Sequence, residues 1–209
     1  MDIERRSYKV ELRADSKNGM PTMIGRAAVF NSLSDVMKTE DGMFFQEKIM
    51  PGAMDECMND DVRALFNHDP NLILARTGSK TLRLAANENG LDFELDPPDT
   101  SYARDLQVSM SRGDIDQCSF GFAVASGGDK WQRDSVSGMI IRTITKIAKL
   151  FDVSPVTYPA YVNTNCATRS AQEFIKLEEE EKRALEEANN PKYTDVEYRR
   201  KMLELNSKL

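Results

Sequence analysis

The sequence predicts an α+β fold, with a body of short strands and a few helices followed by a charged helical segment. In the body, apolar and polar residues alternate over short runs separated by Gly, Pro, Asn and Asp, which is the pattern of half-buried strands. Residues 171–209 differ sharply, because they contain no glycine, one proline and many Glu, Lys, Arg, Leu and Ala. We therefore expect a globular domain over residues 1–165 and a linker with a charged helical tail over 166–209.

Strands dominate the prediction for the first hundred residues. The expected strands are Tyr8–Arg13, Met23–Phe30, Val62–Phe66, Leu72–Arg76, Thr81–Ala86 and Leu91–Leu95. Asn89-Gly90, between the last two, is a strong β-hairpin signal because both residues tolerate the positive φ of a tight turn. Pro51-Gly52 is expected to open a short helical stretch over Ala53–Met58, since proline suits the first turn of a helix.

The rest of the body is predicted to contain a helix and further strands. We expect Thr100 to cap a helix over Ser101–Arg112 and Gly113 to end it. A strand should follow over Ile115–Ala125 and break at the glycine pair 127–128. The next expected strands are one long run over Met139–Phe151 and its continuation over Val153–Tyr158, with a bend at Pro155.

The tail, residues 171–209, is predicted to form two helices. Ser170 and Glu173 have the spacing of a capping box, and Asn189-Asn190-Pro191 should end this first helix. A second helix is expected over residues 194–205. The tail carries 8 Lys and Arg against 10 Asp and Glu, and its glutamate run at 178–181 indicates a solvated face. With few apolar residues to bury, the tail is expected to project from the body or to pack on a partner.

Composition excludes several classes of protein. The net charge of −6 argues against binding to phosphate backbones, and no apolar run is long enough to span a membrane. The charged first six residues lack the apolar stretch of a secretory signal. The three cysteines form no CxxC pair, and a single histidine excludes sites that need two imidazoles. We expect a cytosolic protein that needs no metal or cofactor and binds neither nucleic acid nor membrane.

Three residues are candidates for chemistry, although each also has an ordinary structural explanation. His68 ends an apolar strand, where an imidazole with an ordinary pKa of about 6.5 suits a general base, but a surface histidine fits the same pattern. Ser119 lies inside an apolar strand, where its hydroxyl needs a partner, as any satisfied core serine does. Asp152 could orient an imidazole or simply cap a turn. Motifs for phosphate binding, dinucleotide binding, paired-carboxylate chemistry and the GxSxG elbow are absent from the sequence.

Three stretches of the body occur together in a recognisable order. They are Phe66-Asn67-His68-Asp69-Pro70 with Ala75–Thr77 and Thr81–Leu84; Gly90–Phe93 through Arg112–Asp116 to Ser119-Phe120-Gly121-Phe122; and Arg142–Ile144 through Leu150–Tyr161. In this order and spacing, residues 8–165 resemble the prohead maturation proteases of tailed bacteriophages. The resemblance implies a serine protease with a fold similar to herpesvirus assemblin, a small β-barrel surrounded by helices.

The resemblance also implies roles and partners. His68 would be the general base, Ser119 the nucleophile and Asp152 the third member of the triad, with Arg76, Arg83 or Arg142 helping backbone N–H groups to bind the oxyanion. The substrate would be the scaffolding segment of the major capsid protein, inside the immature prohead in the host cytoplasm, and the chain itself; the chain could also associate as a homo-oligomer. The tail lies beyond the resemblance, and from its few apolar residues we expect it to bind capsid or scaffold protein and to be removed by self-cleavage. Two alternatives stay open: a catalytically silent assembly or scaffolding protein with the protease fold, and a general β-rich binding module.

Overall fold

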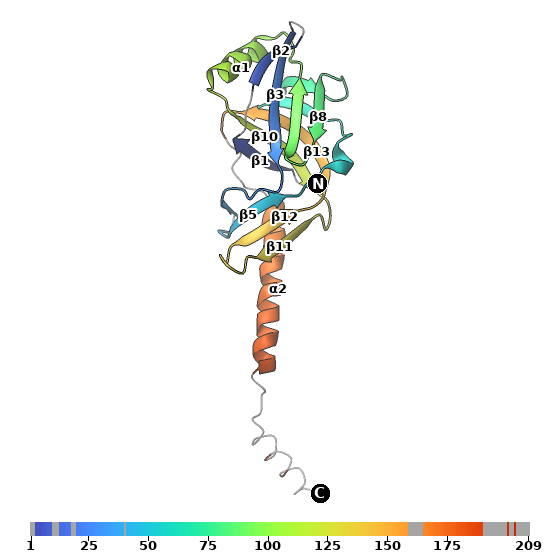
Figure 1. The fold of residues 1–209 in the computed structure, drawn as a ribbon. Helices are drawn as coiled ribbons and strands as arrows, with labels where there is room; N and C mark the ends of the chain where they lie inside the picture. The colour runs from blue at the N-terminus through green and yellow to red at the C-terminus, as the bar shows by residue number, and fades with distance from the viewer. Residues whose placement is uncertain are drawn as a thin grey trace. The chain divides into compact units, whose positions relative to one another are not determined.

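The computed structural model describes residues 3–9, 13–17, 20–39, 41–158 and 165–189, together with residues 200 and 203. The chain divides into two compact units, Met1–Thr168 and Arg169–Leu209. Unit 1 is a mixed α+β body made mostly of sheets, which confirms the predicted fold class (Figure 1). Within the described residues, no helix is both long enough and apolar enough to cross a membrane.

The described part of unit 1 contains three sheets. Sheet A has the order β1-β10-β13-β6-β7, sheet B the order β2-β3-β9-β8, and sheet C the order β11-β12-β5-β4. The strands are β1 (Glu4–Lys9), β2 (Arg13–Lys17), β3 (Met20–Val29), β4 (Met37–Lys38), β5 (Phe44–Ile49), β6 (Arg63–Phe66), β7 (Asp69–Arg76), β8 (Leu82–Ala86), β9 (Gly90–Leu95), β10 (Gln117–Val124), β11 (Asp129–Arg133), β12 (Ile140–Ile144) and β13 (Ile147–Val156). Figure 1 shows β5, β12 and β11 together at one end of unit 1 and α1 at the other.

The predicted closed barrel is not found among the described residues. Each of the three sheets is open, with an edge strand at both ends of its order, whereas a barrel requires its first and last strands to pair. The expected ring of helices is also reduced: in the described part of unit 1, one α-helix and one 3₁₀ turn accompany the strands. The core is instead closed by packing between sheets, as residues from all three form one buried apolar cluster.

Strand β10 shows how the sheets position the interior. Successive side chains of a strand point to opposite faces, so Phe120 and Phe122 enter the core while Ser119 points to the other face of sheet A. The rings of Phe120 and Phe122 lie 4.8 Å apart at their centroids. Strand β10 lies between β1 and β13 in sheet A, and six of its eight residues are buried. The prediction of an apolar strand containing Ser119 is confirmed.

A buried ionic network joins sheet A to sheet C. Arg142 of β12 donates to both oxygens of Glu4 at 2.6 and 2.9 Å, and to Asp129 at 2.7 Å. Arg6 of β1 donates to both oxygens of Glu47 at 2.7 Å. Each arginine also contacts the other's glutamate. Burial alone would raise the pKa of Glu4, but the hydrogen bonds and charges of the two guanidinium groups outweigh it and lower that pKa.

The helix predictions are confirmed in part. Helix α1 spans Ser101–Arg112, and Gly113 ends it at a φ of 80° with its N–H bonded to Met110, as expected. The Thr100 hydroxyl makes no capping bond, however, and is buried without a partner. The helical stretch expected over Ala53–Met58 is a single 3₁₀ turn, η1 (Asp55–Cys57).

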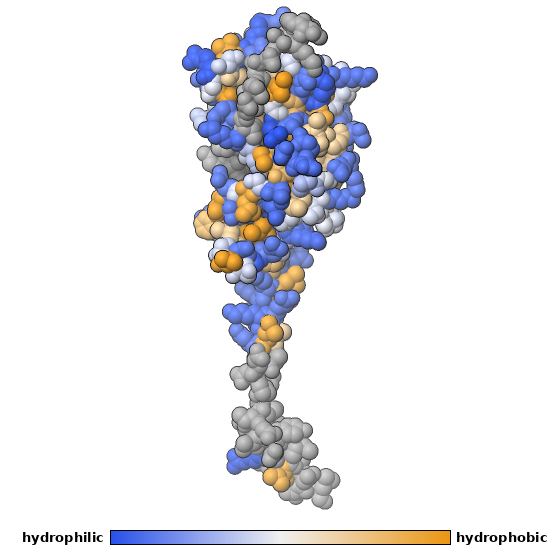
Figure 2. All heavy atoms as spheres, viewed as in Figure 1, coloured by the Kyte–Doolittle hydropathy of each residue, from blue (hydrophilic) through white to orange (hydrophobic). Residues whose placement is uncertain are grey.

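Helix α2 (Asn165–Asn189) differs from its prediction at one end. It begins five residues before the proposed Ser170 cap, because residues 165–169 contain neither glycine nor proline and continue the helix. It ends at Asn189, two residues before Pro191, as expected. Hydrophilic residues cover most of its visible surface in Figure 2. The second tail helix predicted over residues 194–205 lies outside the described residues, apart from positions 200 and 203.

The long strand predicted over Met139–Phe151 is two strands in different sheets. β12 belongs to sheet C and β13 to sheet A, and the chain crosses between them at Thr145 and Lys146. Both of these residues donate their N–H to the carbonyl oxygen of Gly128, at 2.7 and 3.0 Å. Their N–H groups therefore take no part in strand pairing, and the chain passes from one sheet to the other here. β13 then runs without a break through Pro155 to Val156, so the bend predicted at Pro155 is not found.

Candidate active site

His68 lies in a two-residue turn that its sequence neighbours hold in place. Phe66 pairs with Asp69 across the β6–β7 hairpin, so Asn67 and His68 form the loop. Both have positive φ, 54° and 58°, as a type I′ turn requires. Asparagine and histidine are both among the non-glycine residues that adopt positive φ more often than others, so both residues suit this turn.

The turn is attached to the end of β13 through Asn67. The Asn67 N–H donates to the carbonyl oxygen of Pro155 at 3.0 Å, and its side-chain oxygen accepts from the Thr157 N–H at 2.8 Å. The side-chain amide of Asn67 also donates to the Thr157 hydroxyl at 3.1 Å. These bonds fix the backbone from which the His68 ring projects over β13 and β10.

Ser119 and Asp152 come from adjacent strands of sheet A. Ser119 of β10 pairs with Ser154 of β13, and Gly121 of β10 pairs with Asp152. Because paired residues share a face, Ser119, Ser154 and Asp152 project to the same side of the sheet. Asp152 lies within a strand, so it is not a turn-capping residue. The sheet register therefore brings together two residues that are 33 positions apart in the sequence.

The three side chains form a continuous chain of contacts. His68 Nε2 lies 2.7 Å from Ser119 Oγ, and His68 Nδ1 lies 2.5 Å from Asp152 Oδ2. An ionised carboxylate can only accept hydrogen bonds, so the imidazole proton is on Nδ1, and the Nδ1–H group donates a hydrogen bond to Asp152. Nε2 is then unprotonated and accepts from the Ser119 hydroxyl. All three residues expected from the sequence are brought together, in the order serine, imidazole, carboxylate.

The site is shielded from solvent. Ser119 is fully buried, and the side chains of His68 and Asp152 are 11% and 9% exposed. Low exposure strengthens the hydrogen bonds between them, because water competes little for the donors and acceptors.

The neighbouring cysteine is not an alternative nucleophile. Cys118 precedes Ser119 but points into the core, and burial raises the pKa of its thiol far above the ordinary value. Only the thiolate is reactive, so this thiol stays inert at neutral pH. Within the described residues, no group of three or more His, Cys, Asp or Glu side chains could hold a metal ion.

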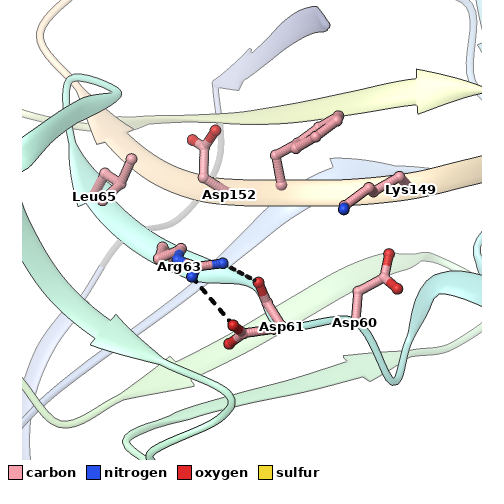
Figure 3. Close-up of a pocket in the computed structure, with 7 residues that line it drawn as sticks. Asp60, Asp61, Arg63, Leu65, Lys149 and Asp152 are labelled. Atoms are coloured by element: carbon pink, nitrogen blue, oxygen red, sulfur yellow. Dashed lines mark hydrogen bonds and ion pairs between the residues drawn. The ribbon is translucent and has the colours of Figure 1, made fainter. Parts of the chain in front are cut away.

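A pocket of about 350 Å³ opens beside Asp152. Its walls come from the segment before β6 and from β6 and β13, and it is lined by Asp60, Asp61, Arg63, Leu65, Lys149, Phe151 and Asp152. Figure 3 shows Arg63 paired with Asp61, with the Asp152 carboxylate projecting away from that pair. Asp152 therefore turns toward His68 rather than toward the nearest arginine.

The three arginines considered for the oxyanion have carboxylate partners outside the triad. Arg142 is buried in the ionic network. Arg76 pairs with Asp61. Arg83 pairs with Asp96 and Glu94, and the hydrogen bond to Asp96 is the largest cause that raises the pKa of its guanidinium. Within the described residues, each of these arginines is thus paired with carboxylates that do not belong to the triad.

Comparison with protein families settles where this chain belongs. The family model described as caudovirus prohead serine protease matches residues 7–177, a span that includes His68, Ser119 and Asp152. The chain belongs to this family. Neither a curated protein nor a solved structure matches the chain. Membership in the prohead serine protease family confirms the resemblance seen in the sequence.

Sequence analysis missed three residues that shape this prohead protease site. They are Asn67, which anchors the turn; Ser154, which donates to Asp152; and Gly121, which faces the same carboxylate. One signal was available for Ser154, because residues two apart in a strand share a face. The contacts of Asn67 and Gly121 depend on strand register, which local sequence does not reveal.

Proposed function

We propose that this chain is a serine endopeptidase that cleaves capsid proteins during maturation of the phage prohead, with Ser119 as nucleophile, His68 as general base and Asp152 as orienting carboxylate. The observation that carries the proposal is the unbroken chain of contacts from Ser119 Oγ through His68 to Asp152, in a member of the prohead serine protease family.

The chemistry follows from the roles of the three groups. Ser119 Oγ attacks the scissile carbonyl carbon while its proton passes to His68 Nε2, and the imidazolium that forms is stabilised by Asp152. The tetrahedral intermediate collapses as the same proton passes to the leaving amine, which breaks the C–N bond and leaves an acyl ester on Ser119. Water, deprotonated by His68, then hydrolyses the ester and frees the serine.

The proposed substrate is the scaffolding segment of the major capsid protein inside the immature prohead, and the chain itself. The assembly forms in the host cytoplasm, where α2 and the residues after it would bind capsid or scaffold protein. Strong charge and few apolar residues favour such an attachment role over a role in the core. Self-cleavage in this tail would release the protease after assembly.

The test measures labelling of the full chain by a fluorophosphonate–rhodamine probe, which reacts with activated serines. We expect wild type to label at Ser119, and Ser119→Ala and His68→Ala to lose labelling almost completely. In parallel, cleavage of co-expressed capsid protein should fall just as far in each single variant, and the double variant should add little, because the residues act as one unit.

Ser109→Ala and Ser111→Ala serve as matched controls, since both serines lie on α1 and outside the contact chain. They should label and cleave as wild type does. A folded wild type that neither labels nor cleaves would overturn the protease proposal in favour of a silent assembly protein. Labelling that persists in Ser119→Ala would assign the nucleophile to another serine.

A further inference from the structure

The Asp152 carboxylate has a second donor besides His68. Ser154 lies two residues further along β13 on the same face, and its Oγ is 2.6 Å from Asp152 Oδ2. Since an ionised carboxylate has no proton to give, the Ser154 hydroxyl must donate. Ser154 is fully buried, so water does not compete for its hydroxyl. One carboxylate oxygen therefore receives two hydrogen bonds, one from the imidazole and one from this serine.

The other carboxylate oxygen rests on Gly121. A Cβ added at Gly121 would lie 2.5 Å from Asp152 Oδ1, closer than real Cβ atoms approach any heavy atom. Its other contacts would be ordinary, with Asp152 Cγ at 3.4 Å and Ile3 at 3.6 Å. The absence of a side chain at Gly121 thus leaves the space that the carboxylate fills. Donors on one oxygen and a close backbone under the other restrict rotation of the carboxyl group.

We propose that Ser154 and Gly121 are positioning residues of the catalytic triad, which hold the Asp152 carboxylate in the plane and distance that His68 needs. The inference rests on the proposed protease function. Ser154 acts through Asp152 and His68, because its buried hydroxyl donates to the carboxylate oxygen that also contacts the imidazole. Its loss leaves substrate contacts unchanged but weakens the orientation of the imidazole.

The surroundings of Asp152 determine how this device responds to pH. The charged or titratable groups that face or flank it are His68 from the turn, Arg63 on β6, Lys149 on β13, Asp60 and Asp61 at the pocket, and the thiol of Cys118 on β10. Without Ser154, the negative charge on Asp152 is stabilised by one hydrogen bond fewer. The carboxylate then attracts the imidazolium proton more strongly, so His68 remains protonated, and inactive as a base, up to higher pH.

The experiment measures the rate of fluorophosphonate–rhodamine labelling of the full chain between pH 5 and 8. We expect Ser154→Ala to slow labelling about 10- to 100-fold, the range for losing a hydrogen bond to a charged group. The acid limb of the rate should move to higher pH by about half a unit or more. Gly121→Ala should slow labelling as well, because the new methyl displaces the carboxylate from the imidazole.

Thr22→Val is the matched control for Ser154→Ala. Thr22 is equally buried, and its hydroxyl lies 3.4 Å from a carboxylate oxygen of Asp96, remote in sequence from the triad. It should destabilise the fold without moving the acid limb. Gly113→Ala, which strains the positive φ at the end of α1, is the control for Gly121→Ala. Thermal melts confirm that each variant is folded at the assay temperature.

Two outcomes would overturn the positioning role while the protease proposal stands. In one, wild type labels at Ser119 and Ser154→Ala labels at the same rate with the same pH profile. In the other, Ser154→Ala is slower but its acid limb stays with that of Thr22→Val, which would mean that the hydroxyl only stabilises the fold. If folded wild type does not label at all, the protease proposal itself fails.

Discussion

Replacing Arg142 with methionine tests the ionic network that joins sheets A and C. Arg142 is fully buried, and its guanidinium donates to Glu4, Glu47 and Asp129. Methionine fills much of the same volume, so the cavity term is small, but Glu4 and Glu47 are then left with Arg6, and Asp129 loses its guanidinium partner. Removing one partner of a buried ion pair costs about 3–5 kcal/mol, because the remaining charge is buried without compensation.

That loss is large against the total free energy of unfolding, about 5–15 kcal/mol for a domain. For a protein of this size each kcal/mol lowers Tm by about 2–4 °C, so Arg142→Met should lower it by about 6–20 °C. The assay is thermal unfolding in a Ser119→Ala background, which prevents self-cleavage. Trp131 is the one tryptophan in the sequence and its ring lies 5.5 Å from the Arg142 guanidinium, so its fluorescence reports on this region.

Arg112→Met is the matched control, because Arg112 pairs with Asp114 at the surface. An exposed pair contributes about 0–1 kcal/mol, so its Tm should barely change. The pH dependence has a definite sign. In wild type the lowered pKa of Glu4 gives stability that is present above its ordinary value of 4.5 and is lost as pH falls. In Arg142→Met the hydrogen bonds and charge that help to lower the Glu4 pKa are lost, so that pKa rises from its wild-type value. The difference in Tm between this variant and wild type should therefore narrow toward acidic pH. Equal Tm losses in the two variants would refute this account of the network.

Three further predictions concern the site and the tail. Asn67→Gly keeps the positive φ of the turn but removes two side-chain bonds to Thr157, so labelling should slow and stability fall by about 1–2 kcal/mol; unchanged labelling would show that the turn holds His68 without this anchor. The labelling rate of wild type should fall as pH drops from 8 to 5, since a protonated imidazole cannot accept the serine proton, and a flat profile would exclude a histidine base. A chain ending at Thr168 should keep its cooperative thermal transition, because the units divide there, and loss of the transition would place α2 in the core.

Local sequence predicted elements well where their signals are local. The strands near residues 62–95, helix α1 and its glycine end follow from alternation, turn residues and capping, all of which act within a few positions. The three triad candidates came from context and from the family resemblance. Their mutual distances depend on the register of β10 against β13 and on the turn at His68, which no local pattern contains.

Strand β5 shows why other parts could not be predicted. Its central residues Gln46, Glu47 and Lys48 resemble an exposed loop, but Glu47 is buried because two arginines from distant strands neutralise it. Its longer pairing in the sheet is with β12, which is parallel and nearly a hundred residues away in the sequence. A buried charge is stable only when its partners are present. A prediction made from one segment alone does not include those partners, so it places Glu47 at the surface.

The order of strands in sheet A determines when Ser119, His68 and Asp152 can come together during synthesis of the chain. β13 is the last strand of the sheet to leave the ribosome, yet it lies third of five, between β10 and β6. His68 contacts Asp152 across 84 positions and Ser119 across 51. The hairpins β6–β7 and β8–β9 can close early, but the two halves of sheet A remain apart until residue 156 has emerged. Such long-range pairing folds slowly. A nascent chain therefore carries no assembled Ser119–His68–Asp152 cluster, so under the proposed function its body must be complete before it can cleave itself or a neighbour.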